Sequence, residues 1–230
     1  MLILPVGDIA PRRRFPFVNY LLIIANVAAF FWVAKFAPHD QKERVIQIGL
    51  MVPDHWTWTS LFTSMFLHAD ILHLGGNMLF LWIAGDNVED RLGHLLYPVF
   101  YLLCGLAGGA AHITMALGPM HSMHDVPTLG ASGAISGVLG AYLVFFPASK
   151  IKFMIWLIIF IRYFTLPSWA VIAFWIGSQV LMARDQFTAH AKGEQMQVAV
   201  FAHLGGFAFG LVWAVVARLF GKPPPRPGND

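Results

Sequence analysis

The sequence predicts an all-α membrane protein, a bundle of six transmembrane helices with both termini in the cytoplasm. Of its 230 residues, 57% are hydrophobic and 12% are charged, whereas an ordinary soluble domain has about 25% charged residues. The mean hydropathy of the chain is +0.64. Several uncharged runs approach the roughly 20 residues that a helix needs to cross a bilayer. These observations indicate an integral, multi-pass membrane protein.

The predicted spans follow one another along the chain. They cover residues 15–34, 71–85, 95–115, 132–147, 163–183 and 198–217. The first run is longer than the roughly 7–15 apolar residues of a signal peptide, so we expect it to stay in the protein. Pro147 ends the fourth span because proline cannot continue a helix, and Pro167 falls in the first turn of the fifth, where proline is tolerated.

Two connections are apolar enough to lie in the membrane interface. Residues 38–70 begin polar, but residues 55–69 contain Trp56, Trp58 and Phe62 and no Asp, Glu, Lys or Arg. Aromatic side chains of this kind favour the membrane–water boundary. Residues 153–161 are too short to span and are closed by Arg162. We expect them to form an interfacial or partly inserted piece.

Lysine and arginine placement predicts the orientation. Ten of the 15 Lys and Arg residues fall on the side of the termini and five on the other, and the richer side is normally cytoplasmic. We therefore expect a cytoplasmic N-terminal segment (1–14), a six-helix domain (15–220) and a cytoplasmic tail (221–230). The tail contains four prolines, a composition typical of disorder.

Charge and cysteine content exclude several functions. The net charge is +3, but the basic residues lie in short loops rather than in a stripe with exposed aromatics, so we expect no nucleic-acid partner. Cys104 is the only cysteine. An intrachain disulfide and a cysteine-based zinc site are therefore excluded.

Three polar residues in separate spans fall at one depth. Counted back from the predicted cytoplasmic stops, Ser132 and His203 lie 15 residues in and His73 lies 16, which is roughly 22–24 Å at about 1.5 Å per residue. Polar groups at one level on separate helices indicate a site. Ser132 also begins its helix, and the first-turn amides need partners. We infer a wet cavity open to the outside.

Ser132 and His203 have the chemistry of a nucleophile and a general base. Small residues would let their helices touch: Gly130, Gly133, Gly137 and Gly140 around the fourth span, and Gly206 and Gly210 in the sixth. Neither span contains a carboxylate, so the pair would be a dyad with packing orienting the imidazole. The alternative is a packing or capping serine and a hydrogen-bonded core histidine.

His73 and Asn77 are spaced i and i+4, so they face the same way on the second span. Together with the Ser132 amide they would make an oxyanion hole. The alternative is that both form interhelical hydrogen bonds without chemistry.

Histidines in three spans, His73, His112 and His203, raise a metal or haem alternative. The H-E-x-x-H pattern and paired intramembrane carboxylates are missing from the sequence. His121 and His124 fall in a loop, where we expect them to be solvated. We expect no metal and no cofactor.

Three motifs carry a resemblance to a known family. They are Gly130-Ala-Ser-Gly-Ala-Ile-Ser-Gly137, His73-Leu-Gly-Gly-Asn77 and Ala202-His-Leu-Gly-Gly206 with Gly210. Over about residues 12–218 the chain resembles the rhomboid intramembrane serine proteases of bacterial type. The resemblance implies that Ser132 is the nucleophile, that His203 is the general base, and that His73, Asn77 and the Ser132 amide bind the oxyanion.

The resemblance also implies a substrate and a place of action. The substrates would be transmembrane segments of single-pass membrane proteins in the lipid bilayer, of a bacterial inner membrane. Residues 38–70 would be a half-submerged first loop, and the fifth span with loop 184–197 would gate substrate entry. A non-enzymatic binder of transmembrane helices would share this fold.

One position departs from part of the family. Some bacterial members have a tyrosine four residues after the nucleophile that stacks on the histidine, and this chain has Ser136 there. The sequence therefore leaves open what orients the His203 ring.

Overall fold

The computed structural model describes residues 1–157, 159–191 and 199–220. Its α-helices are α1 (Phe17–Phe31), α2 (His39–Gly49), α3 (Trp58–Thr63), α4 (Ile71–Leu92), α5 (Leu96–Leu117), α6 (Ser132–Phe145), α7 (Ser168–Ala191) and α8 (Val200–Phe220). Short turns are η1 (Trp32–Phe36), η2 (Pro53–His55), η3 (Ser64–Phe66) and η4 (His121–Met123), and the strands are β1 (Leu2–Asp8), β2 (Lys150–Leu157) and β3 (Phe160–Pro167). The predicted tail 221–230 and residues 192–198 of the predicted gating loop lie outside the described residues.

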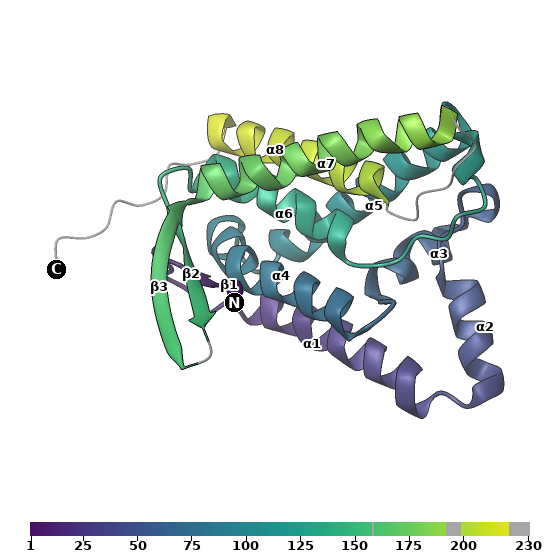
Figure 1. Ribbon diagram of the computed structural model, residues 1–230, viewed down its shortest axis with the longest axis horizontal. Helices are drawn as coiled ribbons and strands as arrows, with labels where there is room; N and C mark the ends of the chain where they lie inside the picture. The colour runs from purple at the N-terminus through teal and green to yellow at the C-terminus, as the bar shows by residue number, and fades with distance from the viewer. Residues whose placement is uncertain (158, 192–198, 221–230) are drawn as a thin grey trace, which may run out of the picture.

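Helix α6 is the central element of the bundle. The long helices run along the long axis of the molecule, the sheet lies at one end, and α2 and α3 lie at the other (Figure 1). Every residue of α6 from Gly133 to Tyr142 is buried. Its most extensive interface is with α8, and it also packs on α5 and α4.

Glycines bring α6 and α8 into backbone contact. A Cβ added at Gly206 would lie 2.0 Å from the Gly133 carbonyl oxygen, and one at Gly210 would lie 2.0 Å from that of Gly137. A Cβ at Gly140 would lie 2.6 Å from the carbonyl oxygen of α8 at position 207. Side chains at these positions would push the helices apart. The close contact sets the start of α6 against the first turn of α8.

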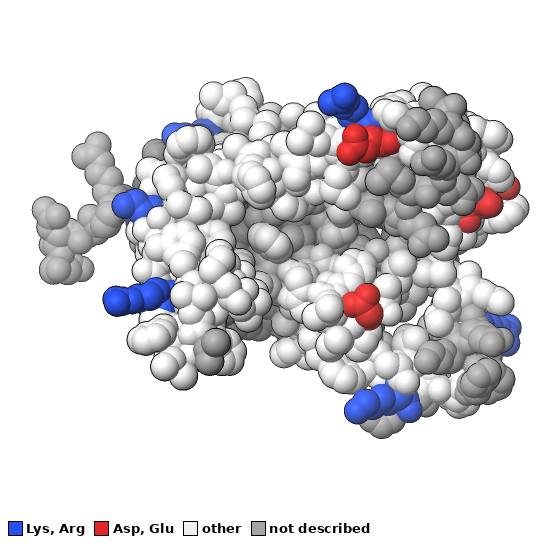
Figure 2. Space-filling model, viewed as in Figure 1, with Lys and Arg blue, Asp and Glu red and all other residues white. Residues whose placement is uncertain are grey.

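Length and composition support an integral multi-pass membrane protein. Among the described residues, Phe17–Lys35, Leu96–Leu117 and Val200–Phe220 are long and apolar enough to cross a membrane. The pair Trp58–Phe66 and Ile71–Leu92, bent by 87°, would make a fourth span. Charged side chains gather toward the two ends of the molecule and leave a broad uncharged band between them (Figure 2). Six spans and cytoplasmic termini stay predictions.

The three-stranded sheet departs from the predicted all-α fold. Strand β2 pairs antiparallel with β1 on one side and with β3 on the other, with Met154 opposite Leu4 and Tyr163. The expected interfacial piece, residues 153–161, belongs to this hairpin, of which residue 158 is not described. The fifth helix begins at Ser168 rather than at residue 163.

The reason for this difference lies in the side-chain pattern. Lys150 and Lys152 alternate with Ile151 and Phe153, a period of two that is typical of a strand. The β-branched and aromatic residues that follow favour a sheet over a short inserted helix. Pro167 consequently ends β3 and precedes the helix instead of standing in its first turn.

The predicted first loop contains most of the small helices. Residues 38–70 form α2, η2, α3 and η3. Thr57 caps α3 by accepting from the Ser60 amide at 3.0 Å. Met51 pairs with Thr128 in an isolated bridge, which ties this loop to the segment that precedes α6.

Candidate active site

Ser132 is the first residue of α6, at the end of a sharp turn. Gly130 has φ +119°, a conformation that residues with a side chain rarely adopt. Its amide donates to the carbonyl of Ser64 at 2.8 Å, so η3 holds the turn in place. The turn directs the polypeptide into the bundle, so the Ser132 hydroxyl lies at the first residue of α6.

The serine and histidine singled out in the sequence meet in the structure. The Nε2 atom of His203, on α8, lies 2.8 Å from the Ser132 Oγ atom on α6. The two residues are 71 positions apart in the chain. The backbone contact between α6 and α8 allows this approach.

A third helix holds the other side of the imidazole. The His203 Nδ1 atom lies 2.7 Å from the Oε1 atom of Gln179, a residue of α7 that is 6% exposed. The ring of Trp175, also on α7, has its centroid 6.0 Å from that of the imidazole. Ser136 does not orient the ring by stacking, and its hydroxyl donates to the Ser132 carbonyl at 2.6 Å. The ring is therefore held from α7.

Our sequence reasoning missed Gln179. The signal was present, because an amide in an uncharged apolar stretch, residues 168–183, marks a site in the same way as an intramembrane histidine. A third member was expected only as a carboxylate on the helix of Ser132 or of His203. Gln179 is a neutral side chain on α7, so that expectation left it out.

His73 and Asn77 lie on α4 beside the start of α6. A Cβ at Gly130 would lie 2.9 Å from the His73 Nε2 atom and 3.6 Å from the Asn77 Nδ2 atom. Asn77 is 8% exposed, and its Nδ2 atom makes no hydrogen bond to the described part of the chain. The two predicted donors therefore face the turn that leads to Ser132, and the Nδ2 atom of Asn77 has no acceptor among the described residues.

Asp70 fixes the first turn of α4, from which His73 projects. Its carboxylate accepts from the amides of His73 and Leu72, each at 2.8 Å. These backbone donors, the His73 amide foremost, hold the pKa of Asp70 below its usual value. The charged carboxylate is the form that caps a helix start best.

A cavity of about 490 Å³ reaches the pair. It is lined by Ser132, His203 and His73, and by residues 125–129 of the loop that precedes α6. A substrate in this cavity would meet the hydroxyl, the imidazole and the His73 side chain together.

Three other histidines considered in the sequence, His112, His121 and His124, make contacts of their own. His112 is 1% exposed, and its Nε2 atom lies 3.0 Å from the Thr128 hydroxyl. His121 and His124 stack on each other with centroids 4.6 Å apart. Within residues 1–157, 159–191 and 199–220, no group of three or more His, Cys, Asp or Glu side chains is arranged to hold a metal ion.

The arrangement is suited to nucleophilic chemistry. A hydroxyl within hydrogen-bond distance of a base, and a base oriented by a third group, are the parts that acyl transfer needs. Donors beside the nucleophile would stabilise charge on a carbonyl oxygen.

Comparison with known proteins identifies a family. A Rhomboid domain matches residues 55–220, a range that contains Ser132, His203, His73, Asn77 and Gln179. Rhomboid protease GluP of Bacillus subtilis is 31% identical over 131 residues, which are 56% of this chain and 24% of that protein. Rhomboid protein 1, mitochondrial, of Saccharomyces cerevisiae is 32% identical over 189 residues, 78% of this chain and 51% of that protein.

A plant relative extends the same comparison. RHOMBOID-like protein 1 of Arabidopsis thaliana is 27% identical over 234 residues, 88% of this chain and 53% of that protein. The chain thus spans between about a quarter and about half of the length of these relatives. They come from a bacterium and from eukaryotes, one of them mitochondrial, so the comparison does not select one kind of membrane.

Proposed function

The chain belongs to the rhomboid family, and we propose that it is an intramembrane serine endopeptidase acting through a Ser132–His203 dyad. The observation that carries the proposal is the 2.8 Å distance between the Ser132 Oγ and His203 Nε2 atoms, at the wall of a cavity in an apolar helix bundle. Relatives named as rhomboid proteases support the same reaction class.

The reaction begins with attack on the scissile carbonyl. Ser132 Oγ bonds to the carbonyl carbon while its proton passes to His203 Nε2, and the carbonyl electron pair moves onto the oxygen. The imidazolium then gives the proton to the amide nitrogen as the C–N bond breaks, which leaves an acyl-enzyme. A water molecule hydrolyses the ester in the same two steps and frees Ser132.

The developing oxyanion needs donors that are already in place. The side chains of His73 and Asn77 and the backbone amide of Ser132 would supply them. Their support is the position of both side chains against Gly130 and the absence of an Asn77 Nδ2 acceptor among the described residues. Preorganised donors of this kind are worth about 10²–10³ in rate each.

The substrates we propose are transmembrane segments of single-pass membrane proteins. A helix hides its carbonyls in its own hydrogen bonds, so cleavage requires local unwinding. We therefore expect glycine, proline or small polar residues near the cut. An apolar cavity of about 610 Å³, lined by residues of α4, α6, α7 and the sheet, borders the bundle on the side of α7.

The proposed orientation places the termini in the cytoplasm of a bacterial cell and Ser132 toward the outer face of its inner membrane. The lysine and arginine count supports this orientation. Residues 38–70 would then lie half submerged in the outer leaflet, and α7 with loop 184–197 would gate entry.

The test is cleavage and covalent labelling in lipid vesicles. The wild-type protein should cut peptides from a panel of transmembrane segments and react with a fluorophosphonate probe. Ser132→Ala should lose about 10⁴-fold or more of the activity and all of the labelling. A Ser132→Ala variant that cuts at the wild-type rate would falsify the assignment. A folded wild-type sample that neither cuts nor labels would instead favour a binder of transmembrane helices.

A further inference from the structure

A short chain of hydrogen bonds leads from the α7 backbone to Ser132. The Ser178 hydroxyl donates to the Trp175 carbonyl at 2.6 Å, and the Gln179 Nε2 atom lies 3.3 Å from the same hydroxyl oxygen. The Gln179 Oε1 atom lies 2.7 Å from His203 Nδ1, and His203 Nε2 lies 2.8 Å from Ser132 Oγ.

The Trp175 carbonyl in the α7 backbone determines which group donates and which accepts in each hydrogen bond of this series. The single hydroxyl proton of Ser178 is bound to the Trp175 carbonyl, so the Ser178 oxygen accepts from the Gln179 amide NH₂. The amide carbonyl of Gln179 therefore points to His203. The orientation of this amide does not depend on the protonation of the imidazole.

The direction of the chain selects one tautomer of His203. A carbonyl oxygen only accepts, so the proton of the neutral ring must be on Nδ1. The Nε2 atom is then unprotonated and accepts the Ser132 O–H. This is the one neutral form in which the histidine can remove the serine proton, and the other tautomer would leave two acceptors, the Nδ1 atom and the Gln179 Oε1 atom, facing each other.

We propose that Gln179 is a positioning residue that holds His203 in its Nδ1–H tautomer and makes the reactivity of Ser132 depend on the position of α7. The proposal rests on the proposed function, since it assigns a partner to the same base. Gln179 takes the place of the carboxylate of a triad, but a neutral amide cannot take up the proton, which stays on His203 until the leaving group accepts it.

The limited packing of α7 makes the support of the His203 ring sensitive to movement of this helix. Helix α7 packs on α8 and α6 much less extensively than these two pack on each other. Trp175 and Gln179 are one turn apart, and both contact the His203 ring. Trp175 and Ser178 also line the apolar cavity of about 610 Å³ beside α7. A segment that enters this cavity and moves α7 would withdraw both supports of the imidazole.

The first experiment compares Gln179→Leu with a control of the same chemistry, Asn26→Leu. Asn26 is a buried amide on α1, at 0% exposure, outside both the site and the proposed gate. In vesicles, Gln179→Leu should lower kcat and the fluorophosphonate labelling rate by about 10–100-fold, the range found when the partner that orients a metal-binding histidine is lost. KM should stay unchanged, and Asn26→Leu should keep the wild-type kcat per folded molecule.

Gln179→Glu tests the tautomer by pH. It keeps an oxygen acceptor and should restore most of the activity lost in Gln179→Leu. Its carboxylate would stabilise the imidazolium, so the acidic limb of its kcat/KM profile should move to higher pH. An unchanged limb, or equal losses in Gln179→Leu and Asn26→Leu, would overturn the positioning role.

Histidine ¹⁵N NMR of the wild-type protein gives a readout that needs no variant to fold well. The signal that His203→Gln removes should show a protonated Nδ1 and an unprotonated Nε2. The opposite tautomer would overturn the proposal even if the enzyme is active. If the wild-type protein and Gln179→Leu label and cleave equally well, only the role of Gln179 is refuted. If the wild-type protein itself is not labelled, the proposed function is refuted.

Discussion

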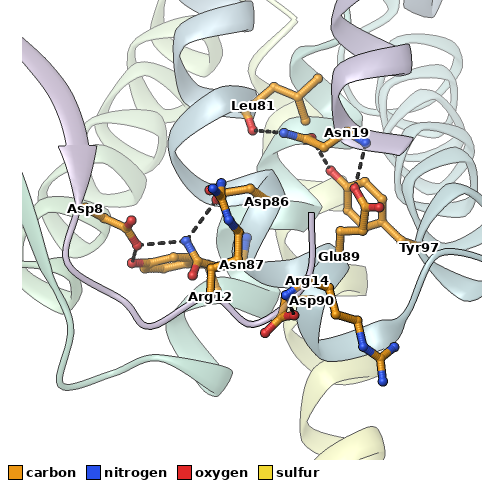
Figure 3. Close-up of polar contacts among 11 residues, drawn as sticks. Asp8, Arg12, Arg14, Asn19, Leu81, Asp86, Asn87, Glu89, Asp90 and Tyr97 are labelled. Atoms are coloured by element: carbon orange, nitrogen blue, oxygen red, sulfur yellow. Dashed lines mark hydrogen bonds and ion pairs between the residues drawn. The ribbon is translucent and has the colours of Figure 1, made fainter. Parts of the chain in front are cut away.

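The described residues form two buried polar clusters, one at the sheet end of the bundle and one around Ser132. The two clusters differ in how far their buried polar atoms have hydrogen-bond partners in the protein. The sheet-end cluster is built around Glu89 of α4, which is 0% exposed (Figure 3). Its carboxylate oxygens accept from the amides of Val18 and Asn19 at 3.1 and 2.7 Å, and one of them contacts the His94 ring at 2.6 Å. At the site of Ser132, by contrast, the buried Asn77 Nδ2 atom has no acceptor among the described residues.

The sheet-end cluster fastens the N-terminal segment to α4. Asn19 donates to the Leu81 carbonyl at 3.1 Å and accepts from the Tyr97 hydroxyl at 2.7 Å. Arg12 forms an ion pair with Asp86 at 2.9 Å. These bonds close on protein partners, so their contribution is to the stability of the fold. Among the described residues of this cluster, the Asn87 Oδ1 atom is the exception, buried without a partner.

In the cluster around Ser132, only some of the buried polar atoms have a hydrogen-bond partner in the described part of the protein. His203 is bound on both ring nitrogens, but the Asn77 Nδ2 atom has no protein partner in the described chain, and neither has either ring nitrogen of His68, whose ring packs against that of His73. Buried polar groups without partners destabilise a fold, and functional sites are where they are retained. This difference predicts that substitutions in the sheet-end cluster change the free energy of unfolding, whereas substitutions around Ser132 change the rate of cleavage.

The largest effect on stability should come from Glu89→Ala. Three donors would lose a buried acceptor, and breaking a buried charged contact destabilises by about 3–5 kcal/mol. Thermal and denaturant unfolding in detergent should show the loss, while the cleavage rate per folded molecule stays at the wild-type value. Glu89→Gln, which keeps a carbonyl acceptor, should lose less. A variant that is stable but slow would contradict the division between the two clusters.

Asn77→Ala should show the reverse pattern. The change removes a proposed donor for the oxyanion and should lower kcat by about 10²–10³-fold. The folded protein loses no hydrogen bond from Nδ2, so its unfolding midpoint should not fall. Asn77→Asp is the matched control, because it keeps the shape without the NH₂ group and should be as slow as Asn77→Ala. Destabilisation with a normal kcat would mean that Asn77 only joins helices.

The sequence predicted the parts of the site that depend on one helix at a time. Uncharged runs located the helices, and the turn at Gly130 marked the start of α6 at Ser132. His73 and Asn77 share a face because of their spacing. These inferences need only helix geometry and hydropathy, which are local properties of the chain.

Of the parts that depend on how one element packs on another, the approach of His203 to Ser132 was expected from their depth and the small residues between their helices, but other contacts were missed. Gln179 reaches His203 only through the way α7 packs on α8, and no spacing within one helix encodes that contact. Glu89 caps α1 from 70 residues away, a contact that no spacing within α4 encodes. The sheet was not predicted because β1 and β2 are far apart in sequence and the short apolar run that ends β2, residues 153–157, fits several structures.

The smallest effect we predict concerns Asp8, where the sheet-end cluster meets β1. Asp8 accepts from the Tyr142 hydroxyl and from Asn87 at 3.0 Å. Burial nevertheless raises the pKa of Asp8 above its ordinary value of 3.8, against the opposing effect of these bonds. A carboxyl with a raised pKa in the folded state stabilises the fold below its unfolded pKa, and this contribution is lost as pH rises through the folded pKa.

Asp8→Asn keeps an oxygen acceptor for Tyr142 and Asn87 but removes the titration. Its unfolding temperature should therefore match or exceed that of the wild-type protein at neutral pH, and this advantage should shrink as the pH falls toward 4. Thermal unfolding of both proteins at several pH values between 4 and 8 measures the difference, and kcat per folded molecule should be equal at each. An advantage that grows toward acid pH would mean that the Asp8 carboxylate acts in its charged form, so the two clusters would differ less than their hydrogen bonds indicate.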